Sequence, residues 1–292
     1  MTPGSDCDVS LFLSSSGHCT LDCPYCIIHP IAKREPSLTY DDIAFVLDQF
    51  NTKAFLAFSG KGDFFAGYRR SERLLSAVLD RDVEIGLDIN GVLIHEFPEL
   101  DQVQLDKIRS MNLTLHYQQI REKHLQKVWA ENAKLLIDKK GEEMLLGTIM
   151  SPLVMDLWEE ALSFYQKEIF SRTGKKIVLV RDINRPLDEE GEAVLLSLKE
   201  RFSESVERIH RENFEDLFQD CDHVMCPAGR SYFRIWNTGE IQGCPNIPEL
   251  AQCGNVKERN ITIRDKLFRC SQTRYCDCNI IDALGKMVHC RG

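Results

Sequence analysis

The stretch GHCTLDCPYC, from Gly17 to Cys26, places Cys19, Cys23 and Cys26 close together. Thiolates with this spacing can all reach one metal centre. A closed zinc site takes four ligands, yet no further cysteine follows until Cys221. Either a nearby histidine completes the site, or one coordination position is left open for a reactant.

Length and composition limit the class of protein. The chain has 292 residues, of which 43% are hydrophobic and 28% charged, as in an ordinary folded protein with a sizeable core. This length suggests about two domains, although α/β barrels of this size can form one. A net charge of −9 gives no electrostatic footprint for nucleic acid or for an anionic membrane.

The start of the chain and its apolar runs predict the compartment. No apolar run approaches the roughly 20 residues of a membrane span, and MTPGSDCDVS lacks the features of a signal peptide. We therefore expect a cytoplasmic protein, in which thiols stay reduced and 12 cysteines indicate metal binding before disulfides.

The cysteines gather at the two ends of the chain. After the first group, a long cysteine-free middle precedes a second group, which consists of Cys221, Cys226, Cys244, Cys253, Cys270, Cys276, Cys278 and Cys290. This distribution predicts two separate metal centres.

The middle of the chain alternates between strand and helix patterns. Apolar, β-prone runs lie at 9–13, 53–60, 83–91, 112–118, 143–150 and 175–182. Amphipathic helical patterns separate them, and the first helix begins with a capping box, Thr39 and Asp42. This alternation predicts right-handed βαβ units, a parallel sheet and an α/β fold, a partial (β/α)6 TIM-like barrel.

The pattern breaks near residue 205, and SYFRIWNTGEIQGC predicts a hairpin around the turn Asn237–Gly239. We therefore divide the chain into a barrel, 1–210, and a small cysteine-rich α+β domain, 211–292.

Polar and glycine residues follow four of the predicted strands, where parallel α/β folds place their chemistry. The first strand is followed by the three cysteines and the fourth by His116. The residues after the second and third strands are Ser59, Gly60, Lys61, Gly62, Asp63, Asp88, Asn90 and Gly91. All of them would meet at one mouth of the barrel.

These motifs resemble the radical S-adenosylmethionine (SAM) superfamily, in which a CxxxCxxC loop, with an aromatic residue before its last cysteine, follows the first barrel strand. The resemblance implies that Cys19, Cys23 and Cys26 hold three irons of a [4Fe–4S] cluster, whose fourth iron binds SAM. It also implies a SAM-binding set of Tyr25, Ser59, Gly60, Lys61, Gly62, Asp63, Asp88, Asn90, Gly91 and Thr148. The family motif usually reads Gly-Gly-Glu, whereas this chain has Lys61-Gly62-Asp63.

The C-terminal cysteines extend the resemblance. The spacing C-x12-G-x4-C from Cys226 to Cys244 is similar to the SPASM and twitch auxiliary-cluster domains. The later cysteines depart from that pattern. The resemblance implies one auxiliary [4Fe–4S] cluster, held by these two cysteines and two of Cys270, Cys276 and Cys278. Cys221 and Cys290 could be ligands of a second auxiliary cluster.

The resemblance implies radical chemistry: one electron splits SAM, and the resulting 5′-deoxyadenosyl radical takes a hydrogen atom from a substrate C–H bond. The auxiliary cluster would relay an electron, and a flavodoxin- or ferredoxin-type protein would donate one. His116, Arg181 and Cys253 are the catalytic candidates, Cys253 as a hydrogen donor in an epimerase, a role that Cys7 could also fill. Arg181 could instead cap a helix.

The start of the chain bears on the class of substrate. The first strand begins about nine residues from Met1, which leaves no room for a leading peptide-binding domain. This favours a small polar metabolite, such as a sugar or aminocyclitol, that is dehydrogenated or epimerised. The alternative is a maturase that modifies a ribosomal peptide or protein.

Simpler interpretations remain open at this point. The three cysteines with His29 or His18 could form a zinc knuckle, and the C-terminal cysteines a structural zinc domain. The glycines could belong to ordinary turns, and His116 could be an interior histidine. The whole chain could then be a non-catalytic iron–sulfur or zinc protein.

Overall fold

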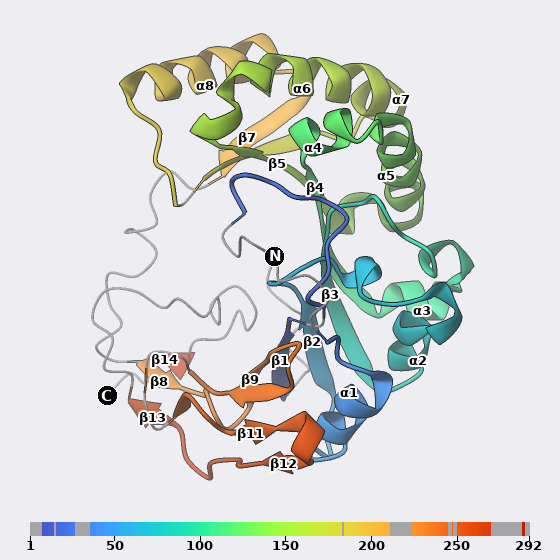
Figure 1. Cartoon of the computed structure of the whole chain (residues 1–292), viewed down its shortest axis with the longest axis vertical. Coiled ribbons are helices and arrows are strands. Elements are labelled where there is room, and N and C mark those ends of the chain that lie inside the picture. Colours follow the sequence, from blue (N-terminus) through green and yellow to red (C-terminus); the bar gives the residue numbers. More distant parts are fainter. Residues whose placement is uncertain are drawn as a thin grey trace.

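The computed structural model describes residues 8–14, 16–26, 36–182, 184–210, 224–244, 247, 250–269 and 288–289. Within them, an eleven-stranded sheet runs in the order β12-β11-β10-β9-β1-β2-β3-β4-β5-β6-β7. Figure 1 shows this sheet curving, with helices along its outer face, and it does not close into a complete barrel. The α/β partial barrel predicted from the sequence is confirmed.

The barrel strands follow one another along the chain and pair in parallel. They are β1 (Val9–Leu13), β2 (Ala54–Phe58), β3 (Val83–Ile89), β4 (Ile108–Leu115), β5 (Met144–Met150), β6 (Ile177–Arg181) and β7 (Val206–His210). The first six overlap the predicted runs, although β4 begins four residues before its run and ends three residues before the end of it. The strand β7 is a seventh strand that the sequence pattern did not predict. Its exposed Glu207 and Arg208 separate the two buried positions, Val206 and Ile209, so that no apolar run is visible.

The helices between these strands bury one face against the sheet. They are α1 (Tyr40–Leu47), α2 (Leu74–Leu79), α3 (Gln102–Asp106), α4 (Tyr117–Glu122), α5 (Gln126–Lys140), α6 (Trp158–Tyr165), α7 (Ser171–Thr173) and α8 (Glu189–Arg201). The predicted capping box of α1 is present, since Thr39 and Asp42 each bond the other's backbone N–H. In the described part of the chain, no helix has both the length and the apolar run that crossing a membrane requires.

The C-terminal segment continues the barrel sheet beyond β1. The strand β9 (Tyr232–Ile235) pairs with β1 in parallel, and β10 (Glu240–Gln242) then pairs with β9 in the antiparallel hairpin that the sequence predicted. Short strands β11 (Gly254–Asn255) and β12 (Asn260–Ile261) complete this edge. A second sheet consists of β13 (Phe268–Arg269), β8 (Val224–Cys226) and β14 (Val288–His289).

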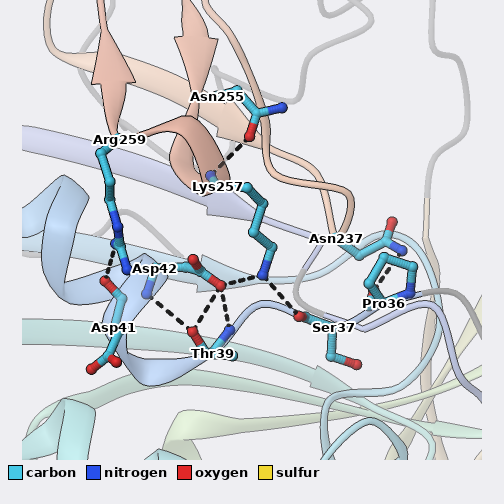
Figure 2. A network of polar contacts seen from close by, with 9 residues as sticks. All are labelled: Pro36, Ser37, Thr39, Asp41, Asp42, Asn237, Asn255, Lys257 and Arg259. Carbon is cyan, nitrogen blue, oxygen red and sulfur yellow. Dashed lines mark hydrogen bonds and ion pairs between the residues drawn. The ribbon is translucent and has the colours of Figure 1, made fainter.

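A polar network fastens this segment to the start of α1 (Figure 2). Lys257 forms an ion pair with Asp42, and its Nζ donates to the carbonyl oxygen of Ser37 at 3.4 Å. The Asn237 amide donates to the carbonyl oxygen of Pro36 at 2.9 Å. The C-terminal segment therefore holds the stretch that leads into α1.

Candidate functional site

A cavity of about 470 Å³ opens at the carboxyl ends of the barrel strands. Most of the predicted site residues line it: Cys19, Cys23, Tyr25, Cys26, Ser59, Gly60, Gly62, Asp63, Asp88, Asn90, His116 and Arg181. The lining also includes residues that the sequence did not single out: Leu21, Asp22, Thr114, Ile149, Val180, Asp182, Asn184 and His210. Their position at or beside a strand end was the signal that could have found several of them.

The three thiols line the edge of this cavity. Cys23 is buried, and Cys19 and Cys26 are partly exposed. Burial raises the pKa of Cys19, and burial together with the neighbouring Cys19 thiol raises the pKa of Cys23 to about 12. Crowded thiols of this kind lose their protons when a bound metal supplies positive charge. The Asn90 Nδ2 group lies 3.4 Å from the Cys19 sulfur, where it can donate to a thiolate.

The placement of the donor groups bears on the single-ion interpretation of this site. Among the described residues, no three His, Cys, Asp or Glu side chains are placed to hold one metal ion. The thiolates of a cubane cluster bind different irons, so their sulfurs lie farther apart than the ligands of a single zinc ion. The zinc knuckle with His18 therefore has no support here, and His29 lies outside the described residues.

The glycine loop after β2 packs directly on the cysteine loop, residues 16–26. Gly62 has φ +78°, and a Cβ there would lie 2.4 Å from the carbonyl oxygen of His18 and 2.5 Å from that of Ser16. The backbone N–H of Asp63 donates to the same His18 oxygen at 2.7 Å. Only glycine fits this close contact. Lys61, in the same loop, does not line the cavity.

Asp63 presents an acceptor atom in the cavity wall. Its side chain is buried, and Oδ2 accepts a hydrogen bond from the Asn90 backbone N–H at 2.8 Å. Its Oδ1 atom is also buried and has no partner at hydrogen-bond geometry among the described residues, although the backbone N–H groups of Phe65 and Ala66 face the carboxylate and lower its pKa against the larger effect of burial. Burial raises the pKa of Asp63 to about 6. A buried oxygen of this kind fits a ligand that brings its own donor, such as an ammonium group.

Two of the predicted cofactor-binding residues hold strand ends and do not line the cavity. A Cβ at Gly91, where φ is +76°, would lie 2.4 Å from Leu113, so this glycine allows close packing behind Asn90. The Thr148 hydroxyl donates to the carbonyl oxygen of Leu115 at 2.9 Å and is buried.

His116 and Tyr25 form a pair above the cysteines. The Tyr25 hydroxyl lies 3.0 Å from Nδ1 of His116, and the two rings stack with their centroids 5.8 Å apart. Burial lowers the pKa of His116 to about 4, and burial raises the pKa of Tyr25 above its usual range. At neutral pH the imidazole is thus uncharged and the phenol protonated. With Tyr25 as donor, the imidazole proton lies on Nε2.

Arg181, Asp182 and His210 line the far end of the cavity, at the ends of β6 and β7. The Nε and Nη2 atoms of Arg181 bond Glu192 of α8 at 2.8 and 2.7 Å. The guanidinium is therefore oriented by a carboxylate, and it adds little net positive charge to the cavity. Asp182 is buried and accepts from the Asn184 backbone N–H at 3.0 Å.

The described C-terminal cysteines lie behind the first strand. Cys226 and Cys244 are buried together with Phe12, whose ring carbon lies 3.3 Å from the position of a Cβ on Gly60. The Phe12 ring therefore belongs to the cluster of these cysteines and also lies beside the glycine loop. The other proposed ligands and candidates, Cys7, Cys221, Cys270, Cys276, Cys278 and Cys290, lie outside the described residues.

Cys253 does not lie beside the cavity as a hydrogen donor to the substrate would. It is buried in the hydrophobic core, and its sulfur lies 3.6 Å from the carbonyl oxygen of Leu250. Cys253 was predicted to lie near the site only because it follows the predicted cluster ligands in the sequence and is not one of them. The loop before β11 turns its thiol into the core.

The fold and the site together define an open α/β partial barrel with three cysteines at one mouth. No protein-family model and no curated protein matches the sequence. Among solved structures, anSMEcpe with bound AdoMet and the Cp18Cys peptide is 15% identical, with a TM-score of 0.51 over 87% of this chain and 78% of that one. This likeness shows a shared fold, and at that level the predicted resemblance to radical SAM enzymes is confirmed.

Two further structures align less closely. A tagged form of anSMEcpe with bound AdoMet is 16% identical, with a TM-score of 0.49 over 85% of this chain and 75% of that one. Streptococcus suis SuiB is 12% identical, with a TM-score of 0.43 over 82% of this chain and 60% of that one.

Proposed function

We propose that the chain is a radical SAM enzyme of the oxidoreductase or epimerase type. Cys19, Cys23 and Cys26 would hold a [4Fe–4S] cluster, and SAM would occupy the cavity beside it. One observation carries the proposal: three thiols, a glycine loop and a buried acceptor, Asp63, open on the same cavity at the strand ends. When bound, the reduced cluster and SAM supply a 5′-deoxyadenosyl radical that abstracts hydrogen from the substrate.

The residues of the chain would then bind and orient the reactants. Oδ1 of Asp63 would accept from the SAM ammonium, which offers the donor that this buried oxygen lacks among the described residues. Gly62 brings backbone close to the cysteine loop, where a side chain would block the approach, and Gly60 allows the same close contact with Ser14 at the end of β1. Asn90 would stabilise a Cys19 thiolate by donating from Nδ2.

The substrate would bind at the far end of the cavity, near Arg181, Asp182 and His210. These polar groups suit a small polar metabolite, such as a sugar or aminocyclitol, that is dehydrogenated or epimerised. Modification of a peptide is the second candidate, because the anSMEcpe structure was solved with a bound peptide. An auxiliary [4Fe–4S] cluster at Cys226, Cys244 and two later cysteines would relay an electron. A flavodoxin- or ferredoxin-type donor would act in the cytoplasm.

The first test measures iron and sulfide per chain after anaerobic reconstitution. We expect Cys19→Ala/Cys23→Ala/Cys26→Ala to lose about four irons per chain, the content of one cubane cluster, and to make no 5′-deoxyadenosine from SAM. The auxiliary iron should remain. A wild-type chain that holds zinc and shows no iron–sulfur chromophore would refute the proposal.

A matched control separates the site from a general loss of thiols. Cys253→Ala removes a buried cysteine outside the cavity and should leave iron content and SAM cleavage unchanged. SAM should also raise the melting temperature of the reconstituted wild type, because a ligand of the native state stabilises it. A non-catalytic iron–sulfur protein would show the iron without this shift.

A further inference from the structure

Three hydrogen bonds fasten the cysteine loop to the segment that begins at the end of β4. The Tyr25 hydroxyl meets Nδ1 of His116 at 3.0 Å. The Asp22 backbone N–H donates to Oε1 of Gln119 at 2.9 Å. Nζ of Lys123 donates to the carbonyl oxygen of Thr20 at 2.9 Å. All three contacted residues, Thr20, Asp22 and Tyr25, lie between the first and the last of the three cysteines.

The three partners belong to one helix face. His116 is the N-cap of α4, Gln119 lies in its first turns, and Lys123 is its C-cap. Positions three and four apart lie above one another on a helix, so these residues form a single stripe. The short helix thus presents two hydrogen-bonding side chains and an ammonium to the loop that carries the thiols.

The central residue of this stripe is held in one orientation. Gln119 is buried, with 5% of its surface exposed. Its Nε2 donates to Glu122 at 2.9 Å, which directs Oε1 toward the Asp22 N–H. A fixed acceptor loses little side-chain freedom when it binds the loop, so the contact serves as a pre-organised anchor.

We propose that the α4 stripe of His116, Gln119 and Lys123 holds the cysteine loop in its cluster-binding conformation before any metal is bound. The loop has little regular structure of its own, and gathering three thiols at a mobile loop would cost conformational entropy at the moment of binding. Because the stripe fixes the loop when the chain folds, this entropy is lost during folding and not during metal binding. The three residues are positioning residues, since they act through the loop backbone and Tyr25.

The purpose of this anchor rests on the proposed function, but its test does not. In the metal-free, reduced full chain, the alkylation rate of Cys23 reports how often the loop opens, because this thiol is buried. Gln119→Leu removes the acceptor with little change in size. We expect about a fivefold faster alkylation of Cys23, the effect of losing one ordinary hydrogen bond on a local opening equilibrium.

Cys253 is an internal reference in the same experiment. It is buried to a similar degree and lies in the C-terminal segment, away from α4. If global unfolding causes the change, both cysteines react faster by the same factor, and the proposal fails. It also fails if Cys23 reacts at the wild-type rate.

Three further variants sharpen the result. Gln118→Leu removes the neighbouring amide, which bonds Glu122 but no described residue of the loop, and should leave Cys23 protected. The exchange Gln119→Glu/Glu122→Gln keeps an acceptor for Asp22 and should restore protection. Lys123→Ala changes an exposed residue, so it tests the anchor even if Gln119→Leu fails to fold.

Iron release connects the anchor to the proposed function. In the reconstituted chain, Gln119→Leu should speed the loss of iron from the three-cysteine site to a chelator and leave auxiliary iron unaffected. If no iron enters that site even in the wild type, the proposed function fails, while the alkylation result still decides whether α4 anchors the loop.

Discussion

Asp63 should show a trade-off between stability and ligand binding. Its pKa is about 6 in the folded chain, against an ordinary value of 3.8. Between these values the native state holds a proton that the unfolded state has released, so this group lowers the free energy of unfolding as pH rises from about 4 to 6. Asp63→Asn removes this effect. We expect it to stabilise the SAM-free chain by about 1–3 kcal/mol at pH 7, since one pKa unit corresponds to about 1.4 kcal/mol.

The measurement is urea unfolding of both chains between pH 4 and 7. The difference between them isolates Asp63 from His116, which acts in the opposite sense: its pKa falls from 6.5 to about 4, so it lowers stability as pH decreases through that range. The stabilising difference should vanish near pH 4. The same variant should bind SAM more weakly by calorimetry. A difference that stays constant with pH would contradict the assigned pKa.

The sequence singled out residues that line the cavity where a motif carries its own chemistry, and their roles stay predictions. A functional site was predicted from three cysteines in one loop and from Gly62 between Lys61 and Asp63. Few structural roles require these residue types at this spacing. Gln119 gives no such signal, because a glutamine on a polar helix is typical of a solvated surface. Only the fold shows that it bonds Asp22, 97 residues away in the sequence.

At the scale of elements, the network of Figure 2 should tie two distant segments into one local unit. The Asp42 side chain is 4% exposed and its partner Lys257 36%. Lys257→Met keeps the apolar stem and removes the charge. We expect a loss of about 1 kcal/mol, the upper range for a partly exposed pair. Hydrogen exchange should become faster in 36–39 and 256–261 together, because each segment holds the other.

A charge-matched control accompanies this change. Lys127→Met alters an 88% exposed lysine of α5 and should leave both the stability and the exchange rates unchanged. Lys257 also helps Thr39 to hold the pKa of Asp42 below its ordinary value against the opposing effect of burial. The pair therefore adds stability above about pH 4, and that stability is lost as the pH falls through the lowered pKa. Faster exchange in 36–39 alone would argue against a shared unit.

Element boundaries followed from the sequence where apolar runs were unbroken. The run at 9–13 coincides with β1, and the hairpin turn at Asn237–Gly239 joins β9 to β10 as expected. The start of β4 was missed, because Arg109 and Ser110 interrupt the apolar pattern. A strand needs only alternate buried positions, and pairing with β3 supplies the rest.

At the scale of the whole molecule, the C-terminal segment is part of the barrel sheet. The strand β1 lies between β2 and β9 and pairs with both in parallel. On one face, Leu11 and Leu13 of β1 belong to the same hydrophobic core as Phe233 and Ile235 of β9. The pattern of the sequence changes at about residue 210, but the hydrophobic core contains residues from both sides of that position.

We therefore predict that residues 1–210 do not fold stably without the segment that follows. Removing 211–292 would expose the edge of β1, where the Ser10 N–H donates to the carbonyl oxygen of Ser231, just before β9, at 2.8 Å and the Ser14 N–H to that of Ile235 in β9 at 2.9 Å. Unpaired edges of buried strands promote aggregation. A chain that ends at Arg269 keeps β9 to β12 and should remain monomeric, with one cooperative unfolding transition. Light scattering and thermal denaturation compare the two. A monomeric 1–210 fragment with a sharp transition would show that the barrel is an independent domain.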